Sequence, residues 1–221
     1  MTQTDTPDQL WAAIDDQRTR TADLLATLTA AQWAEPSLCE GWTVRDVAAH
    51  LTLQQETIGS ILVFTLRHPG LVSVDLNHTI RQSARTLAAE LPAEELIRRI
   101  RAMVGSRRHN SFVTPLETLT DALVHGQDIA IPLGLPLAMD PRAAVIAATR
   151  RWETRGTWLA KVNRRLPLDG LRLRATDAEW AVGEGPEVAG PIAALLLLIT
   201  GRPARVADLA GDGAALLAAR L

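Results

Sequence analysis

The sequence predicts a mainly helical α+β protein, with a helical bundle over residues 1–166 and a small α+β domain over residues 167–221. Two observations support this class. Apolar residues recur at helical spacing through the first two thirds of the chain, with little sign of strands. After residues 166–167 the period changes, and Leu171–Ala175 alternates apolar and charged residues as a half-buried strand does. A chain of 221 residues is long enough to bury a core of ordinary size.

The first two helices are predicted from their apolar spacing and their start signals. One helix is expected from Pro7 to about Trp33. The second opens at Thr43, whose hydroxyl can cap free backbone amides while Asp46 reaches back to it, as in a capping box. Its apolar positions continue to the helix-breaking residues 68–70.

Helical periodicity also predicts the middle of the chain. A third helical region spans residues 76–108 and is interrupted near Pro92. A fourth helix starts at Thr114, with Glu117 completing a capping box, and runs to Gly134. The remaining elements are a helix, two short strands and two further helices, expected at residues 140–161, 171–175, 180–182, 190–201 and 214–221.

Composition excludes several classes of function. The formal net charge is -2, and positive and negative residues are interspersed, so no basic face is available for nucleic acid. The most apolar run, Ile192–Ile199, is too short to cross a bilayer, which takes roughly 20 residues. The polar start does not resemble a signal peptide, and the single cysteine, Cys39, fits a reducing compartment. We therefore expect a cytoplasmic protein without a membrane or nucleic-acid partner.

One group of residues has the spacing of a metal site. Asp121 and His125 lie four residues apart, on one face of the fourth helix. His50, in the second helix, is the candidate third ligand, and Asp46 lies one turn before it, where it could orient the imidazole. Two histidines and a carboxylate form a common catalytic zinc site, because three ligands leave one coordination position open.

Spacing alone leaves other interpretations open. A buried histidine beside an aspartate is more often a hydrogen-bonded pair than a metal ligand. His78 is the rival third ligand. Cys39 is either a nucleophile or a small, partly buried residue, and Trp42 either packs against its own helix or lines a pocket beside the metal.

Three segments resemble one known family. Residues 38–50, which contain Gly-Trp-Thr-Val-Arg-Asp-Val-Ala-Ala-His, resemble a metal-ligand segment of the mycothiol-dependent maleylpyruvate isomerase family, a branch of the DinB-like four-helix bundles. Residues 121–128 are similar to its second metal-ligand segment, and residues 176–203 to its small C-terminal domain. The resemblance therefore covers nearly the whole chain, in the same order.

The resemblance implies a DinB-like four-helix bundle that holds a divalent metal on His50, Asp121 and His125, and zinc is the expected ion. It also implies that mycothiol binds with its sulfur on or near the metal. In the enzyme that we expect, Trp42 lines the cofactor pocket, and Asp46 and Asp128 can orient the ligands. The thiolate would attack a small electrophile, in an isomerisation or an S-transfer. The expected partners are this thiol and the electrophile, and a homodimer is compatible with the chain.

Two details of the resemblance concern specificity. The isomerase has a glutamate as its middle ligand, whereas this chain has the shorter Asp121. This difference counts more against the isomerase's own reaction in this chain than against metal binding. The family also uses a C-terminal arginine for its anionic substrate. Arg202 is the candidate catalytic residue here, and the competing arginines are Arg172, Arg174 and Arg205.

Two other functions compete with the enzyme. In one, the bundle is a non-catalytic module that senses a thiol or small ligand through its metal. In the other, the bundle holds no metal and its histidines only pack.

Overall fold

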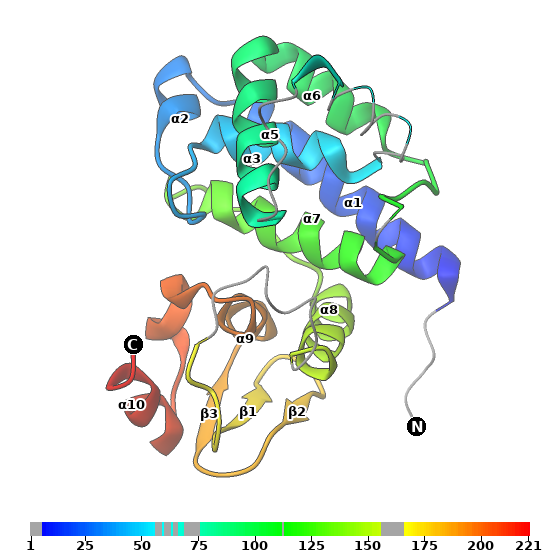
Figure 1. The fold of residues 1–221 in the computed structure, drawn as a ribbon. Coiled ribbons are helices and arrows are strands. Elements are labelled where there is room, and N and C mark those ends of the chain that lie inside the picture. The colour runs from blue at the N-terminus through cyan, green and yellow to red at the C-terminus, as the bar shows by residue number, and fades with distance from the viewer. Residues whose placement is uncertain are drawn as a thin grey trace. The chain divides into compact units, whose positions relative to one another are not determined.

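The computed structural model describes residues 6–55, 59, 63, 66–68, 76–111, 113–155 and 166–221. The chain divides into two compact units, Met1–Ala138 and Met139–Leu221, whose elements are shown in Figure 1. In the part of the chain that the structure describes, no helix is both long and apolar enough to span a membrane.

The N-terminal unit is a bundle of helices. Helix α3 lies against α5, α6 and α7, and α1 lies against α6 and α7 (Figure 1). The elements of this unit are α1 (Pro7–Ala26), α2 (Ala30–Ala34), α3 (Val44–Leu51), the 3-10 helix η1 (Thr52–Gln55), α5 (Leu76–Glu90), α6 (Ala93–Ala102) and α7 (Pro115–Ala130).

The core of the bundle combines small and large apolar side chains. Ala48 and Ala49 of α3 and Ala84 of α5 are fully buried. Small side chains where two helices meet let the helices approach closely. Larger side chains, including Leu25, Leu96 and others, fill the space around them. Burying such side chains provides most of the stabilisation of a bundle.

Two predicted helix starts are confirmed. At the start of α3 the Asp46 backbone N–H donates to Thr43 Oγ1 at 3.2 Å, and the Thr43 N–H donates to Asp46 Oδ2 at 2.8 Å. At the start of α7 the Thr114 N–H donates to Glu117 Oε2 at 2.9 Å. These reciprocal bonds satisfy amides that have no partner inside the helix. Both helices that carry predicted metal ligands are therefore fixed by local sequence.

Other helix boundaries differ from the prediction. The segment predicted as one helix over residues 7–33 forms α1 and α2, because Thr29 and Gln32 form a second capping box that starts α2. Helix α7 ends at Ala130, and Gly134 lies beyond it in a turn with a φ of 64°. Much of the predicted continuation of the second helix, and of the helix predicted to reach residue 161, lies outside the described residues.

The C-terminal unit is a small α+β arrangement. Its sheet has the order β2-β1-β3, with β2 antiparallel and β3 parallel to β1. Helix α9 packs against α8, β1 and η4. The elements are α8 (Pro141–Glu153), β1 (Arg172–Ala175), β2 (Ala181–Val182), β3 (Glu187–Gly190), α9 (Ile192–Ile199), the 3-10 helix η4 (Pro203–Asp208) and α10 (Asp212–Ala218).

The mainly helical α+β class is confirmed, and two features of this unit differ from expectation. Strand β3 was not predicted, because its four residues show no alternation of apolar and charged side chains. The unit also begins at Met139, so α8 groups with it, whereas the sequence placed the boundary near residues 166–167. Buried alanines on α8 pack against α9, and periodicity shows such a face without showing its partner.

The capping box of α7 generates a stability prediction. Replacing Thr114 with Ala leaves helix amides unsatisfied and is expected to lower the free energy of unfolding by about 1 kcal/mol. Urea denaturation followed by circular dichroism measures it. Thr19→Ala, at an exposed position inside α1, is the matched control. The Thr19 hydroxyl donates to a carbonyl of its own helix at 2.8 Å and caps no free amide, so its loss leaves no helix amide without a partner. Equal effects of the two substitutions would contradict the prediction.

Candidate metal centre

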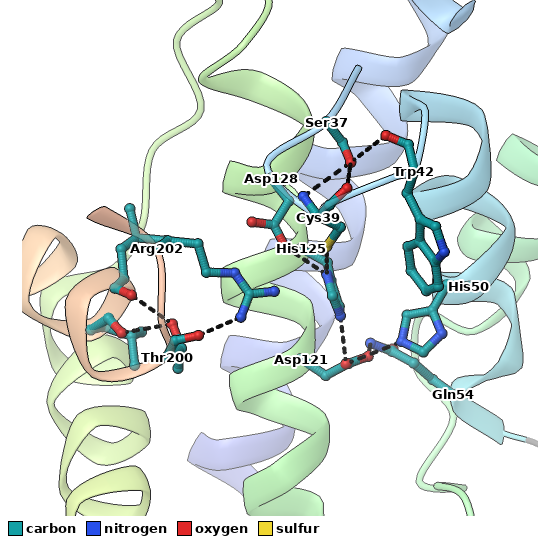
Figure 2. Close-up of polar contacts among 12 residues, drawn as sticks. Ser37, Cys39, Trp42, His50, Gln54, Asp121, His125, Asp128, Thr200 and Arg202 are labelled. Carbon is teal, nitrogen blue, oxygen red and sulfur yellow. Dashed lines mark hydrogen bonds and ion pairs between the residues drawn. The ribbon is translucent and has the colours of Figure 1, made fainter. Parts of the chain in front are cut away.

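The three predicted ligands converge within the N-terminal unit. His50 lies near the end of α3, and Asp121 and His125 lie one turn apart on α7. His50 Nε2 is 3.4 Å and His125 Nε2 is 3.1 Å from Asp121 Oδ1. One ligand atom from each residue lies within 4.8 Å of the others, and Figure 2 shows both imidazoles directed at the carboxylate. The contact of α3 with α7 thus joins residues that are 71 positions apart in the sequence.

The hydrogen bonds of His125 fit a cation site. Its Nδ1 lies 2.8 Å from Oδ2 of Asp128, which is fully buried. With Nδ1–H donating to that carboxylate, Nε2 faces Asp121, and in the neutral imidazole this nitrogen has a lone pair available for an ion. Two imidazole nitrogens and a carboxylate oxygen suit zinc and related divalent ions. The donor set and the tautomer therefore both fit such an ion.

Asp46 does not orient His50, contrary to the sequence expectation. The carboxylate of Asp46 accepts hydrogen bonds from the backbone and hydroxyl of Thr43. His50 Nδ1 is buried and has no hydrogen-bond partner among the described residues. Asp46 does lie one turn before His50 on the same helix, as predicted, but its carboxylate is used by the cap at the helix start.

Trp42 forms one wall of the site. Its ring is 5% exposed, and its centroid lies 5.2 Å from that of His50 and 6.4 Å from that of His125. It also belongs to the buried core of the bundle. Trp42 therefore packs in the core and also lies beside both imidazoles.

Two further residues lie at the site, although the sequence placed neither Cys39 nor Gln54 there. Cys39 Sγ donates to Asp128 Oδ2 at 3.1 Å and lies 3.6 Å from His125 Nδ1. This histidine is 86 positions away in the sequence, so no local spacing could have revealed it. Gln54 Nε2 donates to Asp121 Oδ2 at 2.8 Å. Gln54 follows His50 by four residues, a helical spacing that could have suggested the same side of the chain.

The polar groups at the site shift one another's pKa. Burial opposes charge on Asp121, but the neighbouring His125 and His50 outweigh it and hold the pKa of Asp121 well below its usual range. Burial also opposes protonation of His125, but Asp121, Cys39 and the hydrogen bond to Asp128 raise its pKa well above the usual range. Without a metal, Asp121 and His125 therefore form an ion pair at neutral pH.

These shifts give the metal-free pair a defined pH window. Since folding lowers the pKa of Asp121, its contribution to stability is present above about pH 4, and it is lost as the pH falls through the lowered pKa. Since folding raises the pKa of His125, its contribution to stability is present below about pH 6.5, and it is lost as the pH rises through the raised pKa.

The remaining candidates lie elsewhere. His78 is an exposed residue of α5. The described residues hold two groups that could bind a metal, the one formed by His50, Asp121 and His125 and another formed by Cys39, His125 and Asp128, and His78 belongs to neither. Arg202 belongs to the C-terminal unit, where its Nη1 donates to Thr200 O at 2.6 Å. The competing arginines pair with carboxylates: Arg172 and Arg174 with Glu187, and Arg205 with Asp208.

The fold and this site define a helical-bundle protein with a candidate three-ligand metal centre. Residues 14–108 of this bundle match the family model described as the mycothiol maleylpyruvate isomerase N-terminal domain. The family resemblance predicted from the sequence is thereby confirmed. The match contains Trp42 and His50, whereas Asp121 and His125 lie beyond it.

Solved structures agree with this assignment at the level of the fold. A mycothiol-dependent maleylpyruvate isomerase in which one histidine is replaced by alanine superposes with a TM-score of 0.57 at 14% identity. Another structure of a mycothiol-dependent maleylpyruvate isomerase gives a TM-score of 0.54 at 16% identity. Each comparison covers 94% of this chain and 93% of the other. No curated protein matches the chain.

The ion pair generates a prediction for the metal-free protein. Asp121→Asn removes the charge that most favours protonated His125, so the pKa of His125 is expected to fall. Titration of the imidazole C–H resonances by NMR, after treatment with a chelator, measures it. Asp46→Asn is the control, because that carboxylate bonds Thr43. An unchanged His125 pKa in Asp121→Asn would refute the pairing.

Proposed function

We propose that this protein is a metal-dependent enzyme that uses mycothiol to transform a small electrophile. The observation that carries the proposal is the approach of His50, Asp121 and His125 within 4.8 Å, inside a bundle that carries this domain. Zinc is the proposed ion, because two imidazoles and one carboxylate form a common catalytic zinc site.

The residues of the site have distinct roles in this proposal. His50 and His125 would hold the ion through Nε2, and Asp121 would hold it through Oδ1. Asp128 keeps the proton of His125 on Nδ1, across the 2.8 Å hydrogen bond. Trp42 covers one side of the site with an apolar ring and excludes water there. When bound, the ion would stabilise a thiolate at the open coordination position, so that mycothiol could act as a nucleophile at neutral pH.

The reaction is proposed as a thiol transfer or an isomerisation. In both, the thiolate sulfur adds to an electrophilic carbon of a substrate double bond, and the electron pair of that bond moves onto the rest of the substrate. An isomerisation then expels the thiolate and re-forms the double bond. A transfer keeps the carbon–sulfur bond, and the substrate takes up the proton that the thiol lost. Arg202 is the proposed contact for an anionic substrate, because a guanidinium can bind a carboxylate through two parallel hydrogen bonds. A reducing cytoplasm is the proposed compartment, since it would keep both mycothiol and Cys39 as thiols.

The metal site is tested by replacing His125 with Ala. Loss of one direct ligand is expected to weaken zinc binding by more than about 100-fold, beyond the effect of groups that only orient a ligand. Competition with a chromophoric chelator measures the affinity. His78→Ala is the matched control, because His78 is exposed on α5. Full zinc affinity in His125→Ala, or an equal loss in the control, would refute the site.

The reaction is tested separately from the metal. With mycothiol and a panel of small electrophiles, we expect product formation that stops when a chelator removes the metal and returns when zinc is added. The Arg202→Met variant is expected to lose rate with anionic electrophiles while keeping its zinc affinity. Mycothiol binding without turnover of any electrophile would instead favour the sensor.

A further inference from the structure

A chain of hydrogen bonds joins two elements of the bundle, η1 and α1, to the Asp121 carboxylate at the site. Gln54, in η1, donates through Nε2 to Asp121 Oδ2 at 2.8 Å. Arg18, in α1, donates through Nε to Gln54 Oε1 at 3.2 Å and through Nη1 to the Met103 carbonyl at 3.1 Å. Arg18 is 2% exposed and Gln54 is 7% exposed, so bulk water does not replace these bonds.

We infer that Gln54, held by Arg18, is a positioning residue that makes Asp121 a ligand through one oxygen only. This inference rests on the proposed function, because it concerns how the same site binds its metal. Neither Gln54 nor Arg18 belongs to the three-ligand group, so both act through Asp121.

Arg18 determines which end of the Gln54 amide faces the site. An amide has a donor end and an acceptor end, whereas a guanidinium only donates. Arg18 can therefore bond only the carbonyl end of Gln54, to which it donates. The NH₂ end then points to Asp121 Oδ2, as Figure 2 shows for Gln54 and Asp121.

The hydrogen bond divides the two oxygens of the Asp121 carboxylate between two tasks. Oδ1 lies 3.4 Å from His50 Nε2 and 3.1 Å from His125 Nε2, on the side where a shared ion would bind. Oδ2 accepts from Gln54, which competes with its use as a second metal contact. The metal would then have three protein donors rather than four, and one position stays open for sulfur.

Arg18 is itself fixed by the bundle. Its guanidinium bonds the carbonyl of Met103 and lies 3.5 Å from Asp15 Oδ1, in a region that burial makes costly for an unpaired charge. Arg18 and Gln54 both line a small cavity together with Thr21, Leu51 and three further residues. A buried side chain with such constraints has little freedom to turn, so it can hold the Gln54 amide in one orientation.

The test replaces Gln54 with Met, which keeps the length of the side chain and removes the donor. Zinc affinity is expected to fall by about 10- to 100-fold, as for other groups that orient metal ligands. With cobalt in place of zinc, the visible absorption is expected to weaken, because a second carboxylate contact raises the coordination number. Gln55→Met is the matched control: it lies next along η1, and its Nε2 has no hydrogen-bond partner among the described residues.

A second variant keeps the test decisive if Gln54→Met folds poorly. Gln54→Asn retains an amide but cannot span the distance from Arg18 to Asp121, so the same loss of zinc affinity is expected. Circular dichroism of the metal-free proteins checks that each variant is folded.

Arg18 is tested through a double-mutant cycle. Arg18→Lys keeps the charge and removes the Nε–H that holds Gln54, so it is expected to weaken zinc binding in the otherwise unchanged protein. In the Gln54→Met background it should have no further effect, because the two residues act in series. Additive losses would overturn the role of Arg18.

The outcomes separate this inference from the proposed function. If the unchanged protein binds no zinc, the proposed function fails and the inference with it. If it binds zinc, but Gln54→Met and Gln55→Met match it in both affinity and cobalt spectrum, only the inference is overturned.

Discussion

The packing of α3 against α7 is the contact on which the candidate site depends. Helix α7 contributes Asp121 and His125, but the third candidate ligand, His50, reaches them only because α3 lies alongside. Buried alanines on α3 permit close packing, and the capping boxes at Thr43 and Thr114 fix where the two helices start. Stability of the bundle and geometry of the site are thus set by the same helices.

Both α7 ligands are held from outside their own three-residue group. On one side Asp128, fully buried, bonds His125 and accepts from Cys39. On the other side Gln54 bonds Asp121 and is held by Arg18. Buried polar groups are costly unless they are paired, and paired groups in a low-dielectric interior have little freedom. Such a network would keep the ligands in place before an ion arrives and would reduce the reorganisation that binding requires.

The two halves of the candidate site, on α3 and on α7, are supported by different observations. The family model contains the segment of His50 and Trp42, and the solved structures share the fold across nearly the whole chain at low identity. The α7 half of the site rests on distances within this molecule. Asp121, shorter than the glutamate expected from the resemblance, still reaches both imidazoles. The shorter Asp121 is therefore compatible with the same candidate metal site, whereas the choice of electrophile depends on other residues.

The sequence by itself determined the helix starts, the mainly helical class and the paired spacing of Asp121 with His125, because capping bonds and one-turn neighbours involve residues close along the chain. Only the tertiary structure decided that α8 packs with α9, that β3 joins β1, that Asp46 serves the cap, and that Cys39 and Gln54 reach the α7 ligands. Those pairings join distant segments, and periodicity describes the face of an element without identifying what will cover it.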